Sequence, residues 1–321
     1  MRLRRVTSHL VLVAWDEHWK TKADLKFIAE RVSELDPSVA ATVVAHHKTD
    51  QLKLVPLWFQ PTLSLAMIEK LRRKLLPGRF MTGHRLHKHG EYARMDAAGI
   101  PVPRWEIIKP STKLDPVVWG PYVVEKPSVG RVGAYVRIRR TSRLGYTPPE
   151  ELPLEHYGRR GPMLAQKFVY TGHWPTSYRV VTLFGHVLLS YRIQSRGEGN
   201  GLTGRWDFGT GGLSIVSNTK RMDVELDRDQ KIVDLAEQAH RTAFADLPLL
   251  GFDIVRDAET GKEFVLECHS QGAAWMFSSD MGLNIQAQSG LDFESQYDAL
   301  EKAARILCDV TPRLASVSPP L

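Results

Sequence analysis

Apolar positions in the first part of the chain alternate between strand-like runs and helical spacing. A continuous apolar run at 10–14 predicts a buried strand, and shorter runs at 41–44 and 52–58 predict two more. Between and after them, apolar residues recur every three or four positions and predict two helices, marked by Leu25, Ile28, Ala29, Val32 and Leu35, and by Ile68, Leu71 and Leu75. Strands that alternate with helices predict a small α/β lobe.

Strand patterns dominate the middle of the chain after one further helix. That helix is expected over 88–98, with Gly99 in place to cap its end. The strands that follow are expected at 122–124, 135–138, 164–169 and 178–193. This part of the chain is therefore predicted to have an α+β character.

A glycine-rich stretch at 197–212 interrupts the strand pattern and predicts a loop. An amphipathic helix is expected at 232–244, a strand pair at 251–269 and a last helix at 293–308. We therefore divide the chain into an N-terminal lobe (1–83), a central lobe (84–170) and a C-terminal lobe (171–321).

The strand pair near the end of the chain concentrates negative charge on one face. A turn centred on Thr260 places Asp253 opposite Glu267, and alternation puts His269 on the same face. The other face carries an apolar set that belongs to a core: Phe252, Ile254, Phe264, Leu266 and Cys268. Opposed like charges are destabilising unless a cation lies between them. The pair predicts a site for a hard divalent cation such as Mg²⁺; the alternative is an exposed hairpin edge with hydrated acids.

A second hairpin concentrates positive charge. Gly185 and His186 are expected to form a two-residue type II′ turn, which places Arg179 opposite Arg192. An anion between two guanidinium groups relieves their repulsion and accepts bidentate hydrogen bonds. The hairpin therefore predicts an anion site. The alternatives are arginines that diverge into water, or a register shifted by one residue.

A loop with two glycines connects two of the central strands. Lys126 lies at the end of the strand motif at 123–127, and Gly130 and Gly133 lie in the connection to the next strand. Glycine lets backbone N–H groups approach phosphate oxygens, and lysine supplies a positive charge beside them. The spacing is that of neither a P-loop nor a dinucleotide-binding fold, so on its own an ordinary turn is the more frequent explanation.

Composition and charge narrow the classes of partner. With 43% hydrophobic and 25% charged residues the chain is globular, and a net charge of +7 favours anionic partners. Its two cysteines cannot form a disulfide framework, and no apolar run approaches the about 20 residues that cross a bilayer. We expect a cytoplasmic protein without a membrane association. Nucleic-acid binding is the weakest hypothesis, because aromatic residues do not interleave with the basic runs.

Taken in order, the motifs resemble the ATP-grasp superfamily, and in particular its glutathione synthetases, D-alanine–D-alanine ligases and ribosomal-protein glutamate ligases. The likeness runs from about Lys88 to Gly272 and includes the helix that ends in Gly-Ile-Pro-Val-Pro at 99–103. It continues with the lysine strand and its glycine loop, the strand at 164–169, the two arginines and the paired acids. The resemblance implies an ATP-grasp fold, with a small N-terminal α/β lobe and two α+β lobes that clamp ATP.

The resemblance also implies a role for each motif. Residues that bind the nucleotide would be Lys88, Lys126, Ser128, Gly130, Gly133, Gln166, Lys167, Phe168 and Val169. Arg179 and Arg192 would be catalytic and hold the γ-phosphate or an acyl phosphate. Two ions of Mg²⁺ or Mn²⁺ would bind to Asp253, Glu267 and His269. Because His269 replaces the asparagine usual in the family, a softer ion such as Mn²⁺ is favoured.

The implied reaction is the ATP-dependent joining of a carboxylate to an amine through an acyl phosphate. The partners would be a small-molecule or peptide carboxylate and an amine, and the oligomeric state is left open, a homodimer included. The alternative is an ATP-grasp small-molecule kinase or a non-catalytic nucleotide-binding protein. Departures from the family pattern at Lys167, Ser177 and His269 motivate this alternative.

Overall fold

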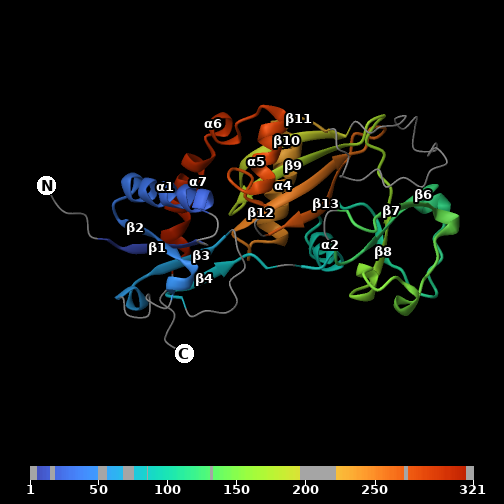
Figure 1. Ribbon diagram of the computed structural model, residues 1–321, viewed down its shortest axis with the longest axis horizontal. Coiled ribbons are helices and arrows are strands. Elements are labelled where there is room, and N and C mark those ends of the chain that lie inside the picture. The colour runs from blue at the N-terminus through green and yellow to red at the C-terminus, as the bar shows by residue number, and fades with distance from the viewer. Residues whose placement is uncertain are drawn as a thin grey trace.

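The computed structural model describes residues 6–14, 19–49, 56–67, 76–84, 86–130, 133–195, 222–270 and 274–315. Three β-sheets follow one another along the long axis of the molecule (Figure 1). The first sheet is parallel and the other two are antiparallel, which confirms the predicted fold class of an α/β lobe followed by α+β lobes. The helix expected around 68–75, most of the strand expected at 52–58 and the loop at 197–212 lie outside the described residues.

The N-terminal sheet has the strand order β2-β1-β3-β4. Its strands are β1 (Ser8–Ala14), β2 (Val39–Ala45), β3 (Thr62–Ala66) and β4 (Arg79–Thr82). Parallel neighbours need a crossover, and α1 (Trp19–Leu35) provides the one between β1 and β2. The strand expected at 52–58 is wrong at its described end, because Pro56–Phe59 is a short 3-10 helix (η2). Proline cannot donate to a strand ladder, and β3 pairs with β1 from Thr62 onward.

The central sheet has the strand order β5-β8-β6-β7 and is antiparallel throughout. Its strands are β5 (Trp105–Ile107), β6 (Tyr122–Pro127), β7 (Arg137–Arg140) and β8 (Met163–Lys167), and the short helix α3 (Pro116–Trp119) lies between β5 and β6. Helix α2 (Lys88–Ala97) precedes the sheet and ends near Gly99, at φ +69°, as predicted. The strand expected from 135 starts two residues later, because Tyr135 has φ +62°.

The C-terminal sheet has the strand order β11-β10-β9-β12-β13. Its strands are β9 (Thr176–Leu183), β10 (His186–Ser195), β11 (Met222–Leu226), β12 (Leu249–Arg256) and β13 (Glu263–His269). Helix α4 (Gln230–Ala243) covers one face of this sheet, and its predicted apolar stripe is buried there with Val180 and Phe252. The opposite face of the sheet joins a second core.

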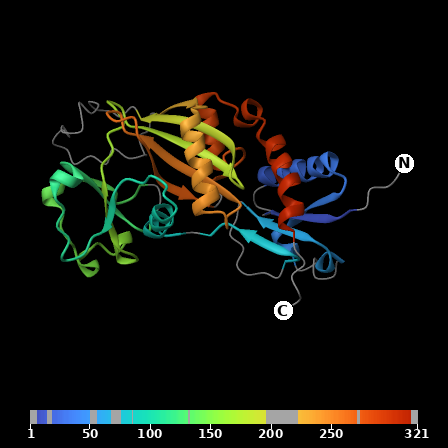
Figure 2. The same ribbon diagram turned by 180° about the vertical axis from the view of Figure 1, so that it is seen from behind.

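Three helices end the described chain: α5 (Asp280–Ser289), α6 (Phe293–Tyr297) and α7 (Ala299–Leu314). The single helix expected at 293–308 is therefore wrong, because Asp298, at φ +54°, divides it in two. Helix α7 returns to the N-terminal lobe and lies beside α1 (Figures 1 and 2), where Nε of Arg31 is 2.6 Å from Oε2 of Glu301. None of the helices in the described part of the chain is long and apolar enough to cross a lipid bilayer.

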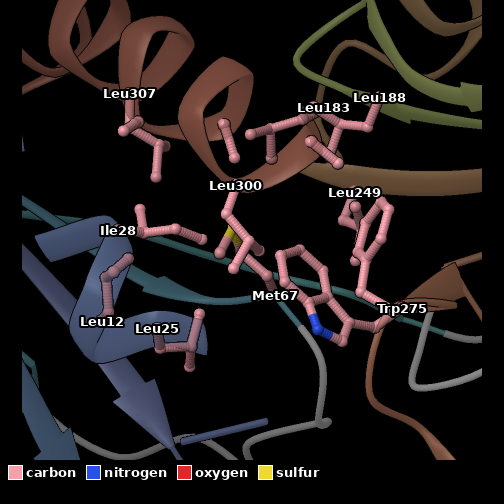
Figure 3. Packing of buried hydrophobic residues seen from close by; sticks show 14 of the residues in the cluster. Leu12, Leu25, Ile28, Met67, Leu183, Leu188, Leu249, Trp275, Leu300 and Leu307 are labelled. Atoms are coloured by element: carbon pink, nitrogen blue, oxygen red, sulfur yellow. The ribbon is translucent and has the colours of Figure 1, made fainter. Parts of the chain in front are cut away.

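One apolar core joins the N-terminal sheet to the C-terminal sheet. Figure 3 shows Ile28 and Leu300 on one side of this core and Leu183 on the other, with Trp275 beside them. Trp275 is fully buried, and its Nε1 donates a hydrogen bond to the carboxylate of Asp24 on α1 (2.8 Å). Because this core is continuous, strands β9, β10 and β12 of the C-terminal sheet are packed against the N-terminal lobe.

The buried imidazole of His240 helps to hold α4 on the C-terminal sheet. Its Nδ1 lies 2.7 Å from Oγ1 of Thr182, and its Nε2 lies 2.9 Å from the carbonyl oxygen of Leu247. Burial lowers the pKa of His240 from 6.5 to about 4. Its contribution to stability is therefore complete above the unfolded pKa and is lost as the pH falls from 6.5 toward 4, because the unfolded chain binds the proton more readily.

We predict that acidification over this range lowers the free energy of unfolding by up to about 3 kcal/mol through His240. The variant His240→Gln should lose most of this pH dependence in urea unfolding curves. The control is Gln238→Ala on the exposed side of α4, which removes no titratable group and should keep the native slope. An unchanged slope in His240→Gln would contradict the prediction.

Candidate active site

Asp253 and Glu267 lie directly opposite each other on β12 and β13, as the sequence predicts. Just beyond this pair the register shifts by one residue. This bulge turns Val265 into the core, where it is 0% exposed, whereas Phe264 and Leu266 are only half-buried. The predicted core face is therefore right for β12 and wrong at Phe264 and Leu266.

The predicted opposition of Arg179 and Arg192 is wrong. The turn of this hairpin is Phe184–Gly185, with φ of +48° and +80°, so both turn residues have the positive φ of a type I′ turn. A further irregularity follows in β10, and Arg179 lies opposite Tyr191. Arg192 is the next residue and points to the other face, where its guanidinium is 2.6 Å from the carboxylate of Glu225 on β11.

Arg179, Asp253 and Glu267 form one row across the neighbouring strands β9, β12 and β13. Residues opposed in this way share a face of the sheet. The guanidinium of Arg179 donates from Nε to Oδ1 of Asp253 (2.6 Å) and from Nη2 to Oδ2 (3.1 Å). This bidentate pair places a fixed cation of the chain against one of the two acids.

Two further cations of the chain reach the acids. Nε2 of His269 lies 3.2 Å from Oδ2 of Asp253 and 3.4 Å from Oε1 of Glu267. Lys88, at the start of α2, forms an ion pair with Glu267. In the part of the chain that the structure describes, Asp253, Glu267 and His269 are the group able to share a metal ion, with ligand atoms within 4.8 Å of one another.

The charges of this cluster compensate one another. Burial acts to raise the pKa of Asp253, but Arg179 and His269 outweigh it and the pKa falls below its ordinary value. Burial acts in the same way on Glu267, whose pKa is nevertheless held well below its usual range by His269 and Lys88. Burial opposes protonation of His269, yet the hydrogen bonds that its ring donates to the carboxylates of Asp253 and Glu267 raise its pKa to about 9. At neutral pH two carboxylates therefore face three cations.

The central sheet contributes Lys126 from β6 and Gln166 from β8. Nζ of Lys126 donates to Oε1 of Gln166 (2.8 Å) and lies 5.2 Å from the ring centre of Tyr92 on α2. Burial, and then the charge of Lys88, lower the pKa of Lys126 to about 8. Nε2 of Gln166 is buried and makes no hydrogen bond of regular geometry among the described residues, although the hydroxyl of Tyr92 is close enough to interact with it. A buried donor without a regular hydrogen bond, next to a buried cation, would be satisfied by a polar ligand.

The glycine loop is joined to the start of α2. The backbone N–H of Lys88 donates to the carbonyl oxygen of Ser128 (3.0 Å), so the loop begins beside the lysine that reaches Glu267. Gly133 has φ +66°, a conformation that favours glycine. Gly130 lies next to the ring of Tyr157.

The predicted hinge residues Lys167, Phe168 and Val169 occupy the end of β8 and the chain just after it. The side chain of Lys167 donates to the carbonyl oxygen of Val118 in α3 (3.1 Å), away from the acids. Phe168 and Val169 are half-buried. Of the predicted site residues, Lys167 and Arg192 thus direct their charged groups to partners outside the acid cluster.

Glu91 is a residue of this region that sequence reasoning missed. It is buried, and its Oε2 accepts a hydrogen bond from the backbone N–H of Cys268 (3.3 Å). Burial raises the pKa of Glu91 to about 7 against the attraction of Lys88. The signal was present in the sequence, because Glu91 lies three positions after Lys88 and shares its helical face.

The donor chemistry of Asp253, Glu267 and His269 fits one divalent ion. Carboxylate oxygens suit Mg²⁺ and Mn²⁺, and an imidazole shifts the preference toward Mn²⁺. Such an ion needs a neutral His269 and a Lys88 that has moved from Glu267, because these two cations now occupy the two carboxylate oxygens of Glu267, Lys88 at Oε2 and His269 at Oε1.

The stability of the metal-free protein depends on whether the cations of the chain already neutralise Asp253 and Glu267. In a bare acidic site, removing a carboxylate relieves repulsion, but here it removes the negative charge that Arg179 and His269 both contact. We predict that Asp253→Asn lowers the free energy of unfolding in EDTA by about 1–3 kcal/mol, measured by urea denaturation. The control Glu225→Gln removes an exposed ion pair and should change it by under about 1 kcal/mol. A stabilised Asp253→Asn variant would disprove this charge balance.

No protein-family model matches the chain, and no curated protein sequence matches it. Solved structures similar to it include D-alanine–D-alanine ligase from Bacillus anthracis, with 12% identity, a TM-score of 0.47 and coverage of 95% of this chain and 99% of that one. D-cycloserine synthetase DcsG has 16% identity, a TM-score of 0.48 and coverage of 94% and 99%. The ATP-grasp ligase PsnB, complexed with a minimal precursor, has 15% identity, a TM-score of 0.47 and coverage of 92% and 99%.

These likenesses are distant and say nothing of substrate or activity. The architecture itself is more informative, because a parallel α/β sheet is followed by two antiparallel sheets. The lysine of the second sheet and the acids of the third are close enough for their charges to interact. The chain therefore combines one parallel sheet with two antiparallel sheets in the order that the sequence motifs predict.

Proposed function

We propose that the protein is an ATP-dependent carboxylate–amine ligase of the ATP-grasp type. The observation that carries this proposal is the convergence of Lys126 and Gln166 from the central sheet with Arg179, Asp253 and Glu267 from the C-terminal sheet. Phosphoryl transfer depends mainly on positioning anions and neutralising them, and buried cations held by a rigid sheet are suited to that task.

The nucleotide would lie between these two sheets. Gln166 would donate from its buried Nε2 to the base, beside the backbone of 167–169. Lys126 would contact the α- and β-phosphates, and the loop from Ser128 to Gly133 would cover them with its backbone N–H groups. The pKa of Lys126 is lowered in the protein without ligand, and a bound phosphate would stabilise its ammonium group in the charged form.

Asp253, Glu267 and His269 would hold a divalent ion, and a second ion is inferred from the family resemblance. When bound, the ions neutralise phosphate charge and polarise the γ-phosphoryl group. His269 gives up its proton and Lys88 leaves Glu267, which frees the lysine for the phosphates. We assign the anion-holding role to Arg179, since Arg192 lies on the other face of the sheet beside Glu225.

The reaction would proceed in two steps. An oxygen of the substrate carboxylate attacks the γ-phosphorus of ATP, which forms an acyl phosphate and releases ADP. An amine then attacks the carbonyl carbon, and inorganic phosphate leaves as the amide forms and the amine loses a proton. The substrates would be a small molecule or peptide with a carboxylate and a second one with an amine, in the cytoplasm.

A kinase or a non-catalytic nucleotide-binding protein is the second candidate. The observation that favours it is the occupation of the acids by cations of the chain, with Lys88 on Glu267 and His269 between both carboxylates. If these cations stay in place, the cluster binds phosphate groups without a metal ion. The products formed with ATP decide between the candidates.

Thermal denaturation with nucleotide tests the site. ATP with Mg²⁺ or Mn²⁺ should raise the melting temperature by about 5 °C at about one hundred times the Kd, because the ligand binds only the folded state. The double variant Asp253→Asn/Glu267→Gln should abolish the shift, and Glu225→Gln should keep it. A full shift in the double variant would rule out the metal assignment.

Product analysis then separates the candidates. An amide together with ADP and phosphate identifies a ligase, in a screen of carboxylates against amines. A phosphorylated product that forms without an amine identifies a kinase. Binding without turnover across the whole panel supports the non-catalytic protein.

His269 allows a prediction about metal choice. Replacing the imidazole by an amide oxygen restores the harder ligand set, so His269→Asn should favour Mg²⁺. We predict that the affinity for Mn²⁺ relative to Mg²⁺, measured by isothermal titration in the presence of ATP, falls by about tenfold or more in this variant. The same ratio in both proteins would show that His269 is not a ligand.

A further inference from the structure

A cavity of about 440 Å³ lies on the outer face of the central sheet. Its volume is in the range of small-molecule sites. Glu125 of β6 lines it together with Arg137 and Arg139 of β7, whereas Lys126, the next residue of β6, is on the opposite face with Gln166. The cavity is thus separated from the candidate active site by the sheet of β6, β7 and β8, at the right of Figure 1.

The lining of the cavity has more positive than negative charge. The carboxylate of Glu125 is nearly buried and is ion-paired with Arg139, so these two charges compensate each other. The guanidinium of Arg159 donates to the backbone carbonyl oxygens of Glu150 and Leu152. The backbone of Arg137 is paired with Glu125 in the β6–β7 ladder, but its exposed guanidinium has no hydrogen bond or ion pair with a side chain in the described ranges and is available to an anion.

Two aromatic rings, those of Tyr135 and His156, lie beside Arg137 in the lining of the cavity. The rings of Tyr135 and His156 lie 4.0 Å apart between centres, with their planes at 42°. Tyr135 holds a strained φ of +62°, so its place depends on contacts such as this one. Nδ1 of His156 accepts a hydrogen bond from the backbone N–H of Gly158, which puts the ring proton on Nε2. Burial and the charge of Arg137 lower the pKa of His156, so that the ring is neutral at pH 7.

We propose that this cavity is a second ligand site and binds a small aromatic carboxylate. The carboxylate pairs with Arg137, and the flat ring lies against Tyr135 and His156. Ile108 and Met163 supply apolar contacts on the side of the sheet. Arg159 also lacks an acid partner among the described residues, but its Nε and Nη2 are directed to backbone carbonyl oxygens, so a single carboxylate matches the one guanidinium of this lining that is free of hydrogen bonds, that of Arg137.

The test is isothermal titration of the full chain with 4-hydroxybenzoate, with and without a non-hydrolysable ATP analogue and Mg²⁺. We expect saturable binding that the nucleotide does not displace. Arg137→Gln should weaken it about tenfold or more, because a charge-assisted bidentate pair is lost. The matched control is Arg140→Gln, three residues further along β7 and on the opposite face, which should change the Kd by less than about twofold.

Three results would overturn the proposal. They are the absence of saturable binding, an unchanged Kd in Arg137→Gln, and displacement of 4-hydroxybenzoate by the nucleotide analogue. Inorganic phosphate that binds as tightly as 4-hydroxybenzoate would equally exclude an aromatic carboxylate as the ligand. The test is independent of the ligase proposal, because the variants lie outside the acid cluster and a failure to bind ATP leaves the expected results unchanged.

Discussion

The bidentate pair of Arg179 and Asp253 is the interaction on which the candidate site depends. Two opposed carboxylates on a half-buried sheet face would repel each other, and one of them would hold its proton. The arginine, fixed one strand away in the same row, keeps Asp253 ionised, and His269 and Lys88 extend this compensation to Glu267. Both carboxylates can therefore stay ionised in the folded protein without a metal ion. A metal ion that enters has to displace cations of the chain, so metal affinity and the position of Lys88 are linked.

Because metal affinity is linked to the position of Lys88, helix α2 takes part in the site. Lys88 joins the helix to Glu267, and its own backbone N–H joins the same point to Ser128 in the glycine loop. If the lysine moves to a phosphate, the ion pair that holds the start of α2 against β13 is replaced by a contact to the ligand. Loop, helix and acids then respond together to the nucleotide, as closure of a site over its substrate requires.

The sequence predicts one hairpin of the site correctly and the other incorrectly for a local reason. The opposition of Asp253 and Glu267 follows from strand alternation and a clear turn signal. The bulge between Asp253 and Ile254 does not change which residue lies opposite Asp253. Opposition of Arg179 and Arg192 needs the turn at Gly185–His186, but Phe184 adopts the positive φ instead. Non-glycine residues rarely do so, and no pattern of apolar positions signals it. Local patterns likewise do not predict contacts between distant segments, such as that of α7 with α1. Among the residues that the sequence analysis missed, Glu91 could have been found, because its spacing from Lys88 places both on one face of α2.

The alternation of side chains along β6 has a second consequence. Because Lys126 turns toward the candidate active site, Glu125 must turn to the other face, and pairing with β7 brings Arg137 and Arg139 to that same side. One acid cannot neutralise both arginines: the carboxylate pairs with Arg139, which leaves Arg137 to an outside anion. The charge on the outer face is therefore a direct result of a strand that has to present a lysine inward. A single sheet can in this way carry two ligand sites of different chemistry, separated only by its own thickness.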